Sequence, residues 1–264
     1  MTGIKFNEFV EIVKRLRKEC PWDREQTNDS IKAATIEEAY EVVEAIEKKN
    51  YEELRNELGD LLLHVVFHTI IASESNDFTI DDVINSIKEK LIRRHPHVFG
   101  DLKVSGSAEV KKNWEEIKLE EGRDSVLDGV PEMLPALQRA HRLQEKASKV
   151  GFDWEKKEDV WEKVIEEIEE MHEIEKAKRQ SIGNEIDEEL YNKLEEEIGD
   201  IFFALVNYSR FLDINPENAL RRTNTKFIKR FSYVENKIKS MGKKLSDSNL
   251  KEMDIFWEES KSKV

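Results

Sequence analysis

Residues 51–75 read YEELRNELGDLLLHVVFHTIIASES, and this stretch decides the fold class of the chain. Its apolar side chains recur every three or four positions, at Leu54, Leu58, Leu61, Leu62, Val65, Val66 and Ile70. In a helix with about 3.6 residues per turn, this spacing gathers them on one face. The stretch therefore predicts an amphipathic helix rather than a strand.

Six further segments show the same helical spacing, and no run alternates apolar and polar residues between turn signals, as a strand would. Thr79 with Asp82 resembles a capping box, and Asn215 before Pro216 marks a helix start. Glycine (10) and proline (5) are too scarce for a turn-rich β fold, so the sequence predicts an all-α protein. The helical segments are residues 6–16, 31–46, 83–92, 160–174, 190–211 and 219–238.

Four short segments of the first half recur in the same order in the second half, which is the most informative feature of the sequence. One acidic match would mean little in a chain with 57 acidic residues, but four ordered matches are hard to obtain by chance. The sequence therefore predicts two tandem homologous helical-bundle domains, residues 1–121 and 136–264. The matched pairs are residues 37–41 with 166–170, 57–60 with 197–200, 90–94 with 226–230, and 114–118 with 257–261.

Segments rich in turn formers or poor in apolar residues separate the predicted helices. The predicted linker between the domains spans residues 122–135 and contains two glycines and two prolines. Loops are expected at residues 20–29 and 96–106, and an acidic connection at residues 180–189.

The net charge of -14 limits the partners of the protein. A surface of that sign repels nucleic acid and anionic membranes, so we expect neither to bind. The longest apolar stretch, residues 61–72, is broken by polar residues and too short to span a bilayer. Cys20 is the single cysteine, and no basic segment precedes an apolar run at the N-terminus, so we expect a cytoplasmic protein.

The acidic motifs of the second half supply a candidate metal site. Residues three apart in a helix share a face, so Glu167 and Glu170 project together, as do Glu197 and Asp200. If their helices pack antiparallel, four carboxylates converge, and a divalent cation with oxygen ligands relieves their repulsion. Mg²⁺ is the expected ion, with Mn²⁺ as a substitute. Glu166 adjoins the cluster and is a candidate to orient or deprotonate an attacking water.

The first half contains the same acidic set. A single motif of this kind in an acidic chain is more often a solvated helix face. In both halves, however, this motif is paired with a second acidic motif beside an apolar stripe. This repeated pairing favours a metal site over a solvated helix face. The second predicted set of metal ligands is Glu38, Glu41, Glu57 and Asp60.

Two further features of the acidic helices are informative. Gly59 and Gly199 interrupt helices, where glycine costs about 1 kcal/mol relative to alanine. Their recurrence suggests the close approach of a neighbouring helix or a ligand. His64 and His68 lie four apart on an apolar helix, which favours a core or interface role over metal binding.

Basic residues near the acidic motifs are candidates to bind a triphosphate. Lys163 and Lys193 each lie one turn before an acidic motif, and Lys226 and Arg230 share a helix face. Ordinary ion pairing within a helix is the alternative for each of them. Trp257 either stacks on a base or anchors the last helix in a core.

The motifs combine into a family resemblance that covers nearly the whole chain. They are Cys20-Pro21-Trp22-Asp23-x-x-Gln26-Thr27, Glu37-Glu38-x-x-Glu41, Glu57-Leu58-Gly59-Asp60-Leu61-Leu62, Arg94-His95-Pro96-His97-Val98-Phe99-Gly100 and Val150-Gly151-Phe152-Asp153-Trp154. Together they resemble the MazG family of nucleoside triphosphate pyrophosphohydrolases. The resemblance implies an all-α pyrophosphohydrolase fold in each half and a homodimer. It also implies broad-specificity conversion of NTPs or dNTPs to the monophosphate and pyrophosphate, with Mg²⁺.

The resemblance further implies roles for residues of the second half. The metal ligands it implies are Glu167, Glu170, Glu197 and Asp200. The nucleotide contacts it implies are Lys163, Glu166, Lys193, Glu196, Lys226, Arg230 and Trp257. All of these positions hold the type of residue that the family pattern requires.

The first half keeps the acidic residues of the family pattern but differs from it at the predicted nucleotide contacts. The positions of Lys163, Lys193 and Glu196 are taken there by Ala34, Glu53 and Asn56. With fewer cations a triphosphate should bind more weakly, so we expect the second half to do most of the catalysis. Two alternatives stay open: a narrower dUTP or dCTP hydrolase of the same superfamily, and an acidic helical protein that binds metal or a partner without catalysis.

Overall fold

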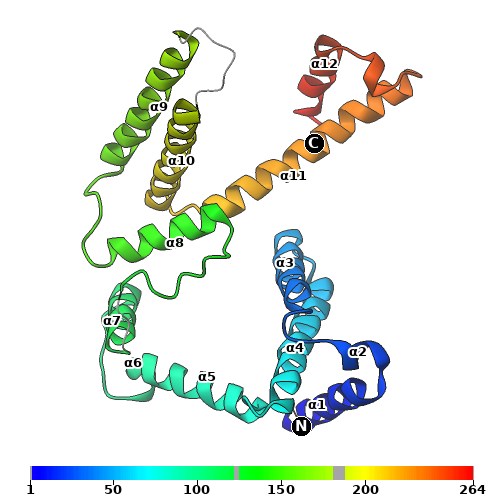
Figure 1. The fold of residues 1–264 in the computed structure, drawn as a ribbon, viewed down its shortest axis with the longest axis vertical. Coiled ribbons are helices and arrows are strands. Elements are labelled where there is room, and N and C mark those ends of the chain that lie inside the picture. Colours follow the sequence, from blue (N-terminus) through cyan, green and yellow to red (C-terminus); the bar gives the residue numbers. More distant parts are fainter. Residues whose placement is uncertain (1, 122–124, 181–187, 264) are drawn as a thin grey trace. The chain divides into compact units, whose positions relative to one another are not determined.

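The computed structural model describes residues 2–121, 125–180 and 188–263 (Figure 1). Every regular element in these residues is helical, which confirms the all-α prediction. Residues 122–124 of the predicted linker and 181–187 of the predicted acidic connection lie outside the described residues. The helices are α1 Thr2–Glu19, α2 Pro21–Glu25, α3 Lys32–Lys48, α4 Tyr51–Glu74, α5 Ile80–Arg94, α6 Pro96–Phe99, α7 Ser107–Glu120, α8 Ala136–Ser148, α9 Lys157–Gln180, α10 Glu188–Phe211, α11 Pro216–Ser240, η1 Leu245–Asp247 and α12 Leu250–Ser260.

Several long helices begin at polar caps. The side chain of Asn50 caps α4, and Thr79 with Asp82 forms the predicted capping box of α5. Asn215 caps α11 directly before Pro216, again as predicted. These caps satisfy backbone N–H groups that have no partner inside the helix.

Two segments that read as loops contain short helices instead, so the loop prediction was wrong there. They are α2 and α6, at Pro21–Glu25 and Pro96–Phe99. Each begins with a proline at its first position, where the missing N–H costs no helical hydrogen bond. That proline was the available signal for a helix start.

The chain forms two compact units, Met1–Val110 and Lys111–Val264. The boundary falls within α7, whose last residues lie next to the predicted domain end at residue 121. No helix in the described parts of either unit is long and apolar enough to cross a membrane.

In the first unit, α3 and α4 form an antiparallel pair, and α1 packs against α4. Burying one large aliphatic or aromatic side chain stabilises a fold by about 1.5–3 kcal/mol. The stretch of residues 51–75 supplies half of the core, including Val66 and Ile70 of its predicted apolar stripe. Other residues of that stripe are exposed, namely Leu58, Leu62 and Val65. The core residues are Val10, Val13, Ile31, Val66, Phe67 and Ile70.

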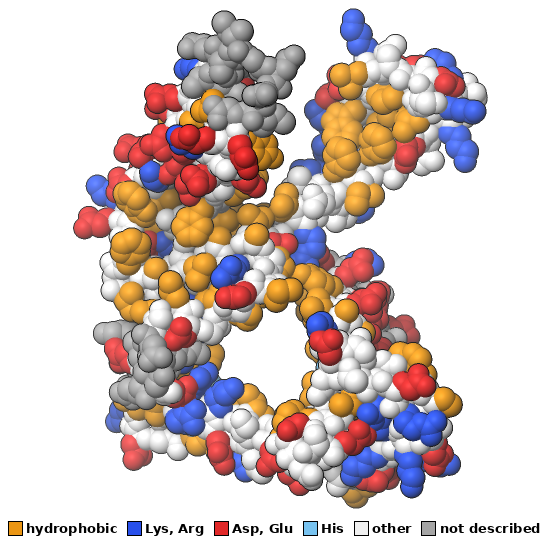
Figure 2. Space-filling model, viewed as in Figure 1, with side chains coloured by type: hydrophobic (Ala, Val, Ile, Leu, Met, Phe, Trp, Pro, Cys, Tyr) orange, Lys and Arg blue, Asp and Glu red, His pale blue; other side chains and the backbone are white. Residues whose placement is uncertain are grey.

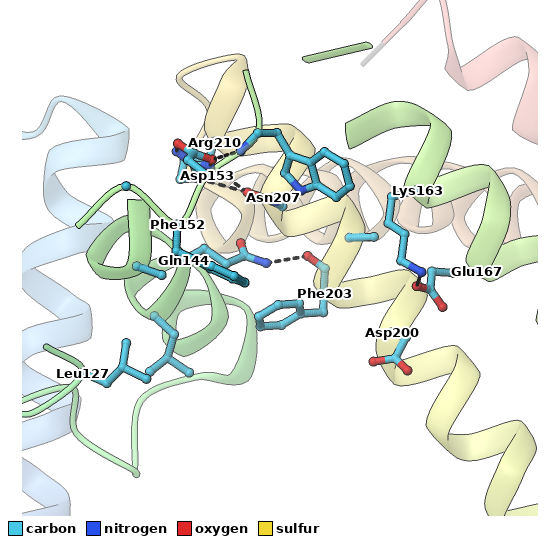
Figure 3. A pocket seen from close by; sticks show the side chains of 15 residues that line it. Leu127, Gln144, Phe152, Asp153, Lys163, Glu167, Asp200, Phe203, Asn207 and Arg210 are labelled. Atoms are coloured by element: carbon cyan, nitrogen blue, oxygen red, sulfur yellow. Dashed lines mark hydrogen bonds and ion pairs between the residues drawn. The ribbon is translucent and has the colours of Figure 1, made fainter. Parts of the chain in front are cut away.

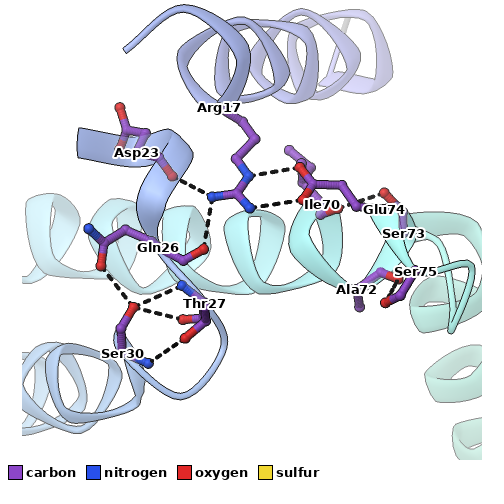
Figure 4. Close-up of polar contacts among 10 residues, drawn as sticks. All are labelled: Arg17, Asp23, Gln26, Thr27, Ser30, Ile70, Ala72, Ser73, Glu74 and Ser75. Atoms are coloured by element: carbon purple, nitrogen blue, oxygen red, sulfur yellow. Dashed lines mark hydrogen bonds and ion pairs between the residues drawn. The ribbon is translucent and has the colours of Figure 1, made fainter. Parts of the chain in front are cut away.

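Arg17 ties three parts of the first unit together (Figure 4). Its guanidinium donates to both carboxylate oxygens of Glu74 at the end of α4, at 2.7 and 2.8 Å. It also donates to the backbone oxygens of Asp23 and Gln26, in and just after α2. Because the Arg17 side chain is only 12% exposed, this paired charge holds the segment after α1 against α4.

Arg17→Ala is expected to lower the free energy of unfolding by about 2–3 kcal/mol, because two carbonyls and a carboxylate lose their donor. Urea denaturation measures this loss. Arg15→Ala is the control, since the exposed Arg15–Glu19 pair contributes little. Equal losses in the two variants would contradict the structural role of Arg17.

The same contact predicts an acid dependence of stability. Hydrogen bonds from Arg17 lower the pKa of Glu74 below its ordinary value. The contact therefore stabilises the fold fully above the ordinary carboxyl pKa of about 4.3, and this contribution is lost as the pH falls through the lowered value. Glu74→Gln should remove that part of the pH dependence, as measured by urea denaturation at a series of acidic pH values.

In the second unit, α9 and α10 lie side by side as an antiparallel pair, and α8 packs against α10 (Figure 1). Val160 and Val164 of α9 are buried, as are Ala204 and Val206 of α10. Helix α11 contacts α8 and α10, and α12 packs against α11. The α9–α10 pair thus corresponds to the α3–α4 pair, as the sequence repeat predicts.

Lys146 fastens the described part of the predicted linker to α8. This residue is only 2% exposed. Its ammonium donates to the backbone oxygens of Val126 and Asp128, each at 3.0 Å. Since a buried charge is tolerated only with such partners, the contact holds this segment, and Leu127 with it, against α8.

Candidate metal and nucleotide site

Three carboxylates meet where α9 and α10 pack together. One oxygen each of Glu167, Glu197 and Asp200 lies within 4.8 Å of the other two. Glu167 is buried, Glu197 is half-buried and Asp200 is exposed, so the cluster faces solvent on one side. Around a hard divalent cation with oxygen ligands at about 2.0–2.6 Å, opposite ligands are about 4–5 Å apart. The three carboxylates therefore fit such an ion.

Glu170, the fourth predicted ligand, also lies on α9 but is exposed and outside this group of three. Its charge nevertheless reaches the cluster. Desolvation first, and then repulsion by Glu170, Glu167 and Asp200, raises the pKa of Glu197 above its ordinary value. A divalent cation is the natural means to relieve this accumulation of negative charge.

Lys163 lies one turn before two acidic residues of α9 and bridges them. Its ammonium nitrogen is 2.7 Å from Glu166 Oε1 and 2.6 Å from Glu167 Oε1. Hydrogen bonds to these two carboxylates raise the pKa of Lys163, so the residue keeps its charge. Lys163 therefore fixes the buried member of the cluster and holds Glu166 beside it.

Lys193 and Glu196 lie on exposed positions of α10. The ammonium nitrogen of Lys193 is 2.7 Å from Glu189 Oε1, one turn towards the start of the helix. For this lysine the structure shows the ordinary ion pairing within a helix that the sequence left open.

Lys226 and Arg230 lie on α11, and Trp257 lies on α12. The guanidinium carbon of Arg230 lies 6.0 Å from the centre of the Trp257 ring. The centres of the Phe227 and Trp257 rings are 5.3 Å apart. Trp257 thus packs α12 against α11 within one chain, and its contact with a nucleotide stays a prediction. In the described part of this unit, none of the three lines the cavity beside the carboxylates.

That cavity has a volume of about 740 Å³ and opens between α8, α9 and α10 (Figure 3). Lys163, Glu167 and Asp200 lie on one side of it, and Arg210 with Asp153 lies away from them. The volume falls within the range of small-molecule sites, about 300–1,000 Å³. The apolar part of the wall includes Leu127, Leu143, Ala147, Phe152, Phe203 and Ala204.

Three polar residues of this wall, Gln144, Asn207 and Arg210, received no role from the sequence. A signal for two of them was available in the repeat. Asn207 and Arg210 lie seven and ten residues after Asp200, whereas the same steps after Asp60 lead to two apolar residues, Phe67 and Ile70. The two halves therefore differ on the helix that carries their second acidic motif.

The first unit repeats the carboxylate cluster on α3 and α4. One oxygen each of Glu38, Glu41 and Glu57 lies within 4.8 Å of the other two. Asp60 lies outside this group. Desolvation first, and then the charges of Glu41 and Asp60, raise the pKa of Glu38 and of Glu57. A divalent cation would relieve the same repulsion here.

A histidine network stands beside this cluster, where the second unit has Ala204 and Tyr208. His64 Nε2 lies 3.9 Å from Glu38 Oε1. Thr35 Oγ1 hydrogen bonds with His64 Nδ1 at 3.0 Å and with His68 Nε2 at 2.8 Å. The two histidines are half-buried members of a polar network.

The glycines of the two acidic helices stand in open space. Apart from its chain neighbours and the backbone of its own helix, a Cβ added at Gly59 or at Gly199 would meet no atom of the described residues within 4 Å. The expectation that a neighbouring helix approaches them is therefore wrong within one chain. A ligand or a second copy is the remaining reason for the glycine.

Gly199→Ala is expected to raise the free energy of unfolding by about 0.5–1 kcal/mol, because alanine is the better helix former. Chemical denaturation measures the change, with Gly59→Ala as the matched substitution in the first unit. A loss of stability in Gly199→Ala alone would contradict this expectation and show that another chain approaches α10.

Comparison with known proteins agrees with the repeat. The profile of the MazG nucleotide pyrophosphohydrolase domain matches the chain twice, over residues 26–99 and 155–234. Each match contains one of the two carboxylate clusters.

Several curated proteins resemble the chain over nearly its whole length. The nucleoside triphosphate pyrophosphohydrolase/pyrophosphatase MazG of Thermotoga maritima is 44% identical, over 98% of this chain and 96% of its own length. The nucleoside triphosphate pyrophosphohydrolase of Escherichia coli K12 is 42% identical, over 97% of each chain. The uncharacterized protein YabN of Bacillus subtilis is 47% identical, over 97% of this chain and 52% of its own length. With two profile matches and these relatives, the chain belongs to the MazG nucleotide pyrophosphohydrolase family.

Proposed function

We propose that this protein hydrolyses nucleoside and deoxynucleoside triphosphates to the monophosphate and pyrophosphate, with Mg²⁺ and for a broad range of bases. The observation that carries the proposal is the cluster of Glu167, Glu197 and Asp200 beside a cavity large enough for a nucleotide. Membership of the family supports the reaction class, and the T. maritima and E. coli relatives bear that activity in their names.

Mg²⁺, or Mn²⁺ as a substitute, suits this donor set because all of its ligands are carboxylate oxygens. When bound, the ion supplies Lewis-acid chemistry and neutralises phosphate charge. Glu167 would hold it from α9, and Glu197 and Asp200 from α10, with Glu170 as the fourth ligand.

The chain's own groups would position the water and the triphosphate. Lys163 holds Glu166 and Glu167 in place and adds a positive charge at the cavity wall. Glu166 is exposed beside the cluster, where it would orient or deprotonate the attacking water. Lys193, one turn before Glu197, and Glu196, directly before it, are both exposed on α10 and are the proposed nucleotide contacts of that helix.

The cluster of the first unit is proposed to contribute little turnover. Its three carboxylates also offer oxygens within 4.8 Å of one another, so it also suits Mg²⁺. Ala34 and Glu53 stand where the second unit has Lys163 and Lys193, which removes two cations that favour a triphosphate. We therefore assign it a weaker or mainly structural role.

A homodimer is the proposed assembly. Large apolar side chains are exposed in the second unit, among them Phe202 at 56%, Ile228 at 63% and Ile255 at 67%. Figure 2 shows apolar side chains gathered over α12 and the adjoining part of α11. Exposed apolar surface of this kind marks interfaces. Light scattering should give about twice the 31.0 kDa mass of the chain.

A second copy would also give Lys226, Arg230 and Trp257 a way to contact a nucleotide, since in one chain they lie apart from the cavity. The proposed compartment is the cytoplasm. The single cysteine, Cys20, is free, which fits a reducing environment.

A panel of NTPs and dNTPs assayed for pyrophosphate, with Mg²⁺ and with EDTA, tests the proposal. We expect release from many substrates, abolished by EDTA. Turnover restricted to dUTP or dCTP would favour the narrower hydrolase of the same superfamily. Pyrophosphate from no nucleotide would instead favour an acidic helical protein that binds metal or a partner.

A further inference from the structure

A chain of polar side chains runs from Asn28 to the carboxylate cluster of the first unit. His68 Nδ1 lies 2.8 Å from Asn28 Oδ1, and His68 Nε2 lies 2.8 Å from Thr35 Oγ1. Thr35 Oγ1 in turn lies 3.0 Å from His64 Nδ1. At the end of this chain, His64 Nε2 faces Glu38 Oε1. The network thus connects an exposed amide to the edge of the cluster.

The contacts along this chain decide which atoms carry the hydrogens. Burial lowers the pKa of His68, which agrees with a neutral ring. Asn28 Oδ1 can only accept, so His68 Nδ1 carries the hydrogen of that ring and His68 Nε2 accepts. Thr35 Oγ1 therefore donates its hydrogen to His68 Nε2, at 2.8 Å, because the Ile31 backbone oxygen is farther away, at 3.2 Å.

This arrangement selects one tautomer of His64. Because the hydrogen of Thr35 points to His68, its Oγ1 accepts at the contact with His64 Nδ1, and that nitrogen carries the hydrogen. In the neutral ring, Nε2 is left with a lone pair. A histidine that binds a metal uses such a nitrogen while its other nitrogen donates to a neighbouring group. The network therefore prepares His64 Nε2 as a metal ligand.

The lone pair of His64 meets a carboxylate and not a donor. Nε2 lies 3.9 Å from Glu38 Oε1, which is too far for a direct hydrogen bond. The two side chains are largely shielded, at 14% and 21% exposure, so water relieves the contact poorly. Two ligands that each lie about 2.0–2.2 Å from one ion are about 3–4 Å apart. The separation therefore suits a cation that both atoms bind.

Asp60 adds a third ligand from the same helix as His64. The two residues lie four apart on α4, and residues at that spacing share a face. Desolvation first, and then the charges of Glu41 and Asp60, raise the pKa of Glu38, so Asp60 lies near enough to act on Glu38. Asp60 stands outside the group of three glutamates, and this position leaves it available to an ion at His64.

The second unit has no counterpart of this nitrogen ligand. Val164 and Ala204 take the positions of Thr35 and His64 there, and both are buried apolar residues. In the described part of that unit, the cluster consists of carboxylates. Oxygen ligands suit Mg²⁺, whereas an imidazole nitrogen favours transition metals such as Co²⁺, Ni²⁺ and Zn²⁺. The two repeats therefore differ in the ion that their ligands suit.

We propose that the first unit binds a divalent transition-metal ion through His64 Nε2, Glu38 and Asp60, and that this ion joins α3 to α4. Ligands from two helices would stabilise their pairing, which gives the first cluster a structural purpose. The proposal concerns metal binding alone. It therefore stands or falls separately from the hydrolysis assigned to the second unit.

Calorimetry with Co²⁺ and, separately, with Mg²⁺ tests the proposal on the full-length protein. His64→Gln removes the ligand nitrogen and keeps a polar side chain. Thr35→Val removes the hydroxyl that selects the tautomer and reproduces the Val164 of the second unit. His172→Ala, which removes an exposed histidine of α9, is the matched control. Urea denaturation without metal checks that each variant folds.

We expect the unmodified protein to bind one Co²⁺ per chain tightly at this site. That affinity should fall about 100-fold in His64→Gln and about tenfold in Thr35→Val, with Mg²⁺ binding unchanged. Co²⁺ should also raise the melting temperature of the unmodified protein, because it binds the folded state, and His64→Gln should lose this increase. His172→Ala should behave like the unmodified protein in both measurements.

Unchanged Co²⁺ affinity in a folded His64→Gln variant would overturn the proposal. Equal losses of Co²⁺ and Mg²⁺ binding would also overturn it, because the substitution would then have disturbed the carboxylates. Loss of the tight Co²⁺ site in His172→Ala would assign the ion to the surface of α9 instead. If His64→Gln does not fold, Thr35→Val decides by the same comparison of Co²⁺ with Mg²⁺.

Discussion

Asp200→Asn is expected to reduce Mg²⁺-dependent pyrophosphate release by about 100-fold or more, because it removes a charged ligand from the cluster. Asp200 is the exposed member of the three carboxylates within 4.8 Å of one another, so it stands on the side that substrate approaches. The amide keeps the shape of the side chain, so the loss reports on charge. Steady-state pyrophosphate assays at saturating Mg²⁺ measure it.

Two controls separate this effect from misfolding. Glu195→Gln changes another exposed acid of α10, outside the cluster, and should leave turnover nearly unchanged. Without Mg²⁺, Asp200→Asn should be at least as stable as the unmodified protein, since repulsion on Glu197 decreases. Full Mg²⁺-dependent turnover in Asp200→Asn would contradict the assignment of the ligand.

Lys163→Ala should lower kcat/KM by about 10- to 100-fold, the equivalent of one or two charge-assisted hydrogen bonds. The substitution removes the donor to Glu166 and Glu167 and reproduces the Ala34 of the first half. Initial-rate kinetics with a triphosphate measure the change. Lys163→Arg should recover part of the activity, because it restores a positive charge at the same place.

Lys157→Ala is the matched control for this lysine. Lys157 lies at the start of α9, where its ammonium is 3.9 Å from Glu158 Oε1 and 53% of the side chain is exposed. Its removal should leave kcat/KM nearly unchanged. Equal losses in Lys157→Ala and Lys163→Ala would mean that general charge, not the contact with Glu167, matters.

The helical architecture followed from local patterns in the sequence. Apolar spacing located the long helices, and caps such as Asn215 located their starts. The convergence of Glu167, Glu197 and Asp200 followed from two i, i+3 motifs and an antiparallel pair. These features depend on one helix or on two neighbours, which is why a single sequence was enough.

The cavity could not be predicted in the same way. Its wall combines Gln144 of α8, Phe152 of the joining segment and Asn207 of α10, which no local pattern relates. The orientation of Asn207 depends on Arg210, whose guanidinium is fixed in turn by Asp153. Such chains of contacts depend on tertiary packing, and only the difference between the two repeats pointed to them.

The predicted nucleotide contacts on α11 and α12 could not be placed from the sequence for a different reason. Family resemblance implies that Lys226, Arg230 and Trp257 contact the nucleotide, whereas in one chain none of the three lines the cavity. Arg230 of α11 lies instead near the ring of Trp257 of α12. A sequence motif indicates which residues contact the nucleotide, but it does not indicate whether they contact the nucleotide bound to their own chain or to a second copy. Their role therefore stays a prediction.

The central claim is that the second unit carries the catalysis, and one matched pair of variants tests it most directly. Glu57 and Glu197 occupy corresponding positions, and each supplies an oxygen to its cluster. Pyrophosphate release is measured for Glu57→Gln and Glu197→Gln under the same Mg²⁺ and triphosphate concentrations. We predict a loss of about 100-fold or more in Glu197→Gln and nearly full activity in Glu57→Gln. Abolished release in Glu57→Gln, with Glu197→Gln still active, would contradict the account.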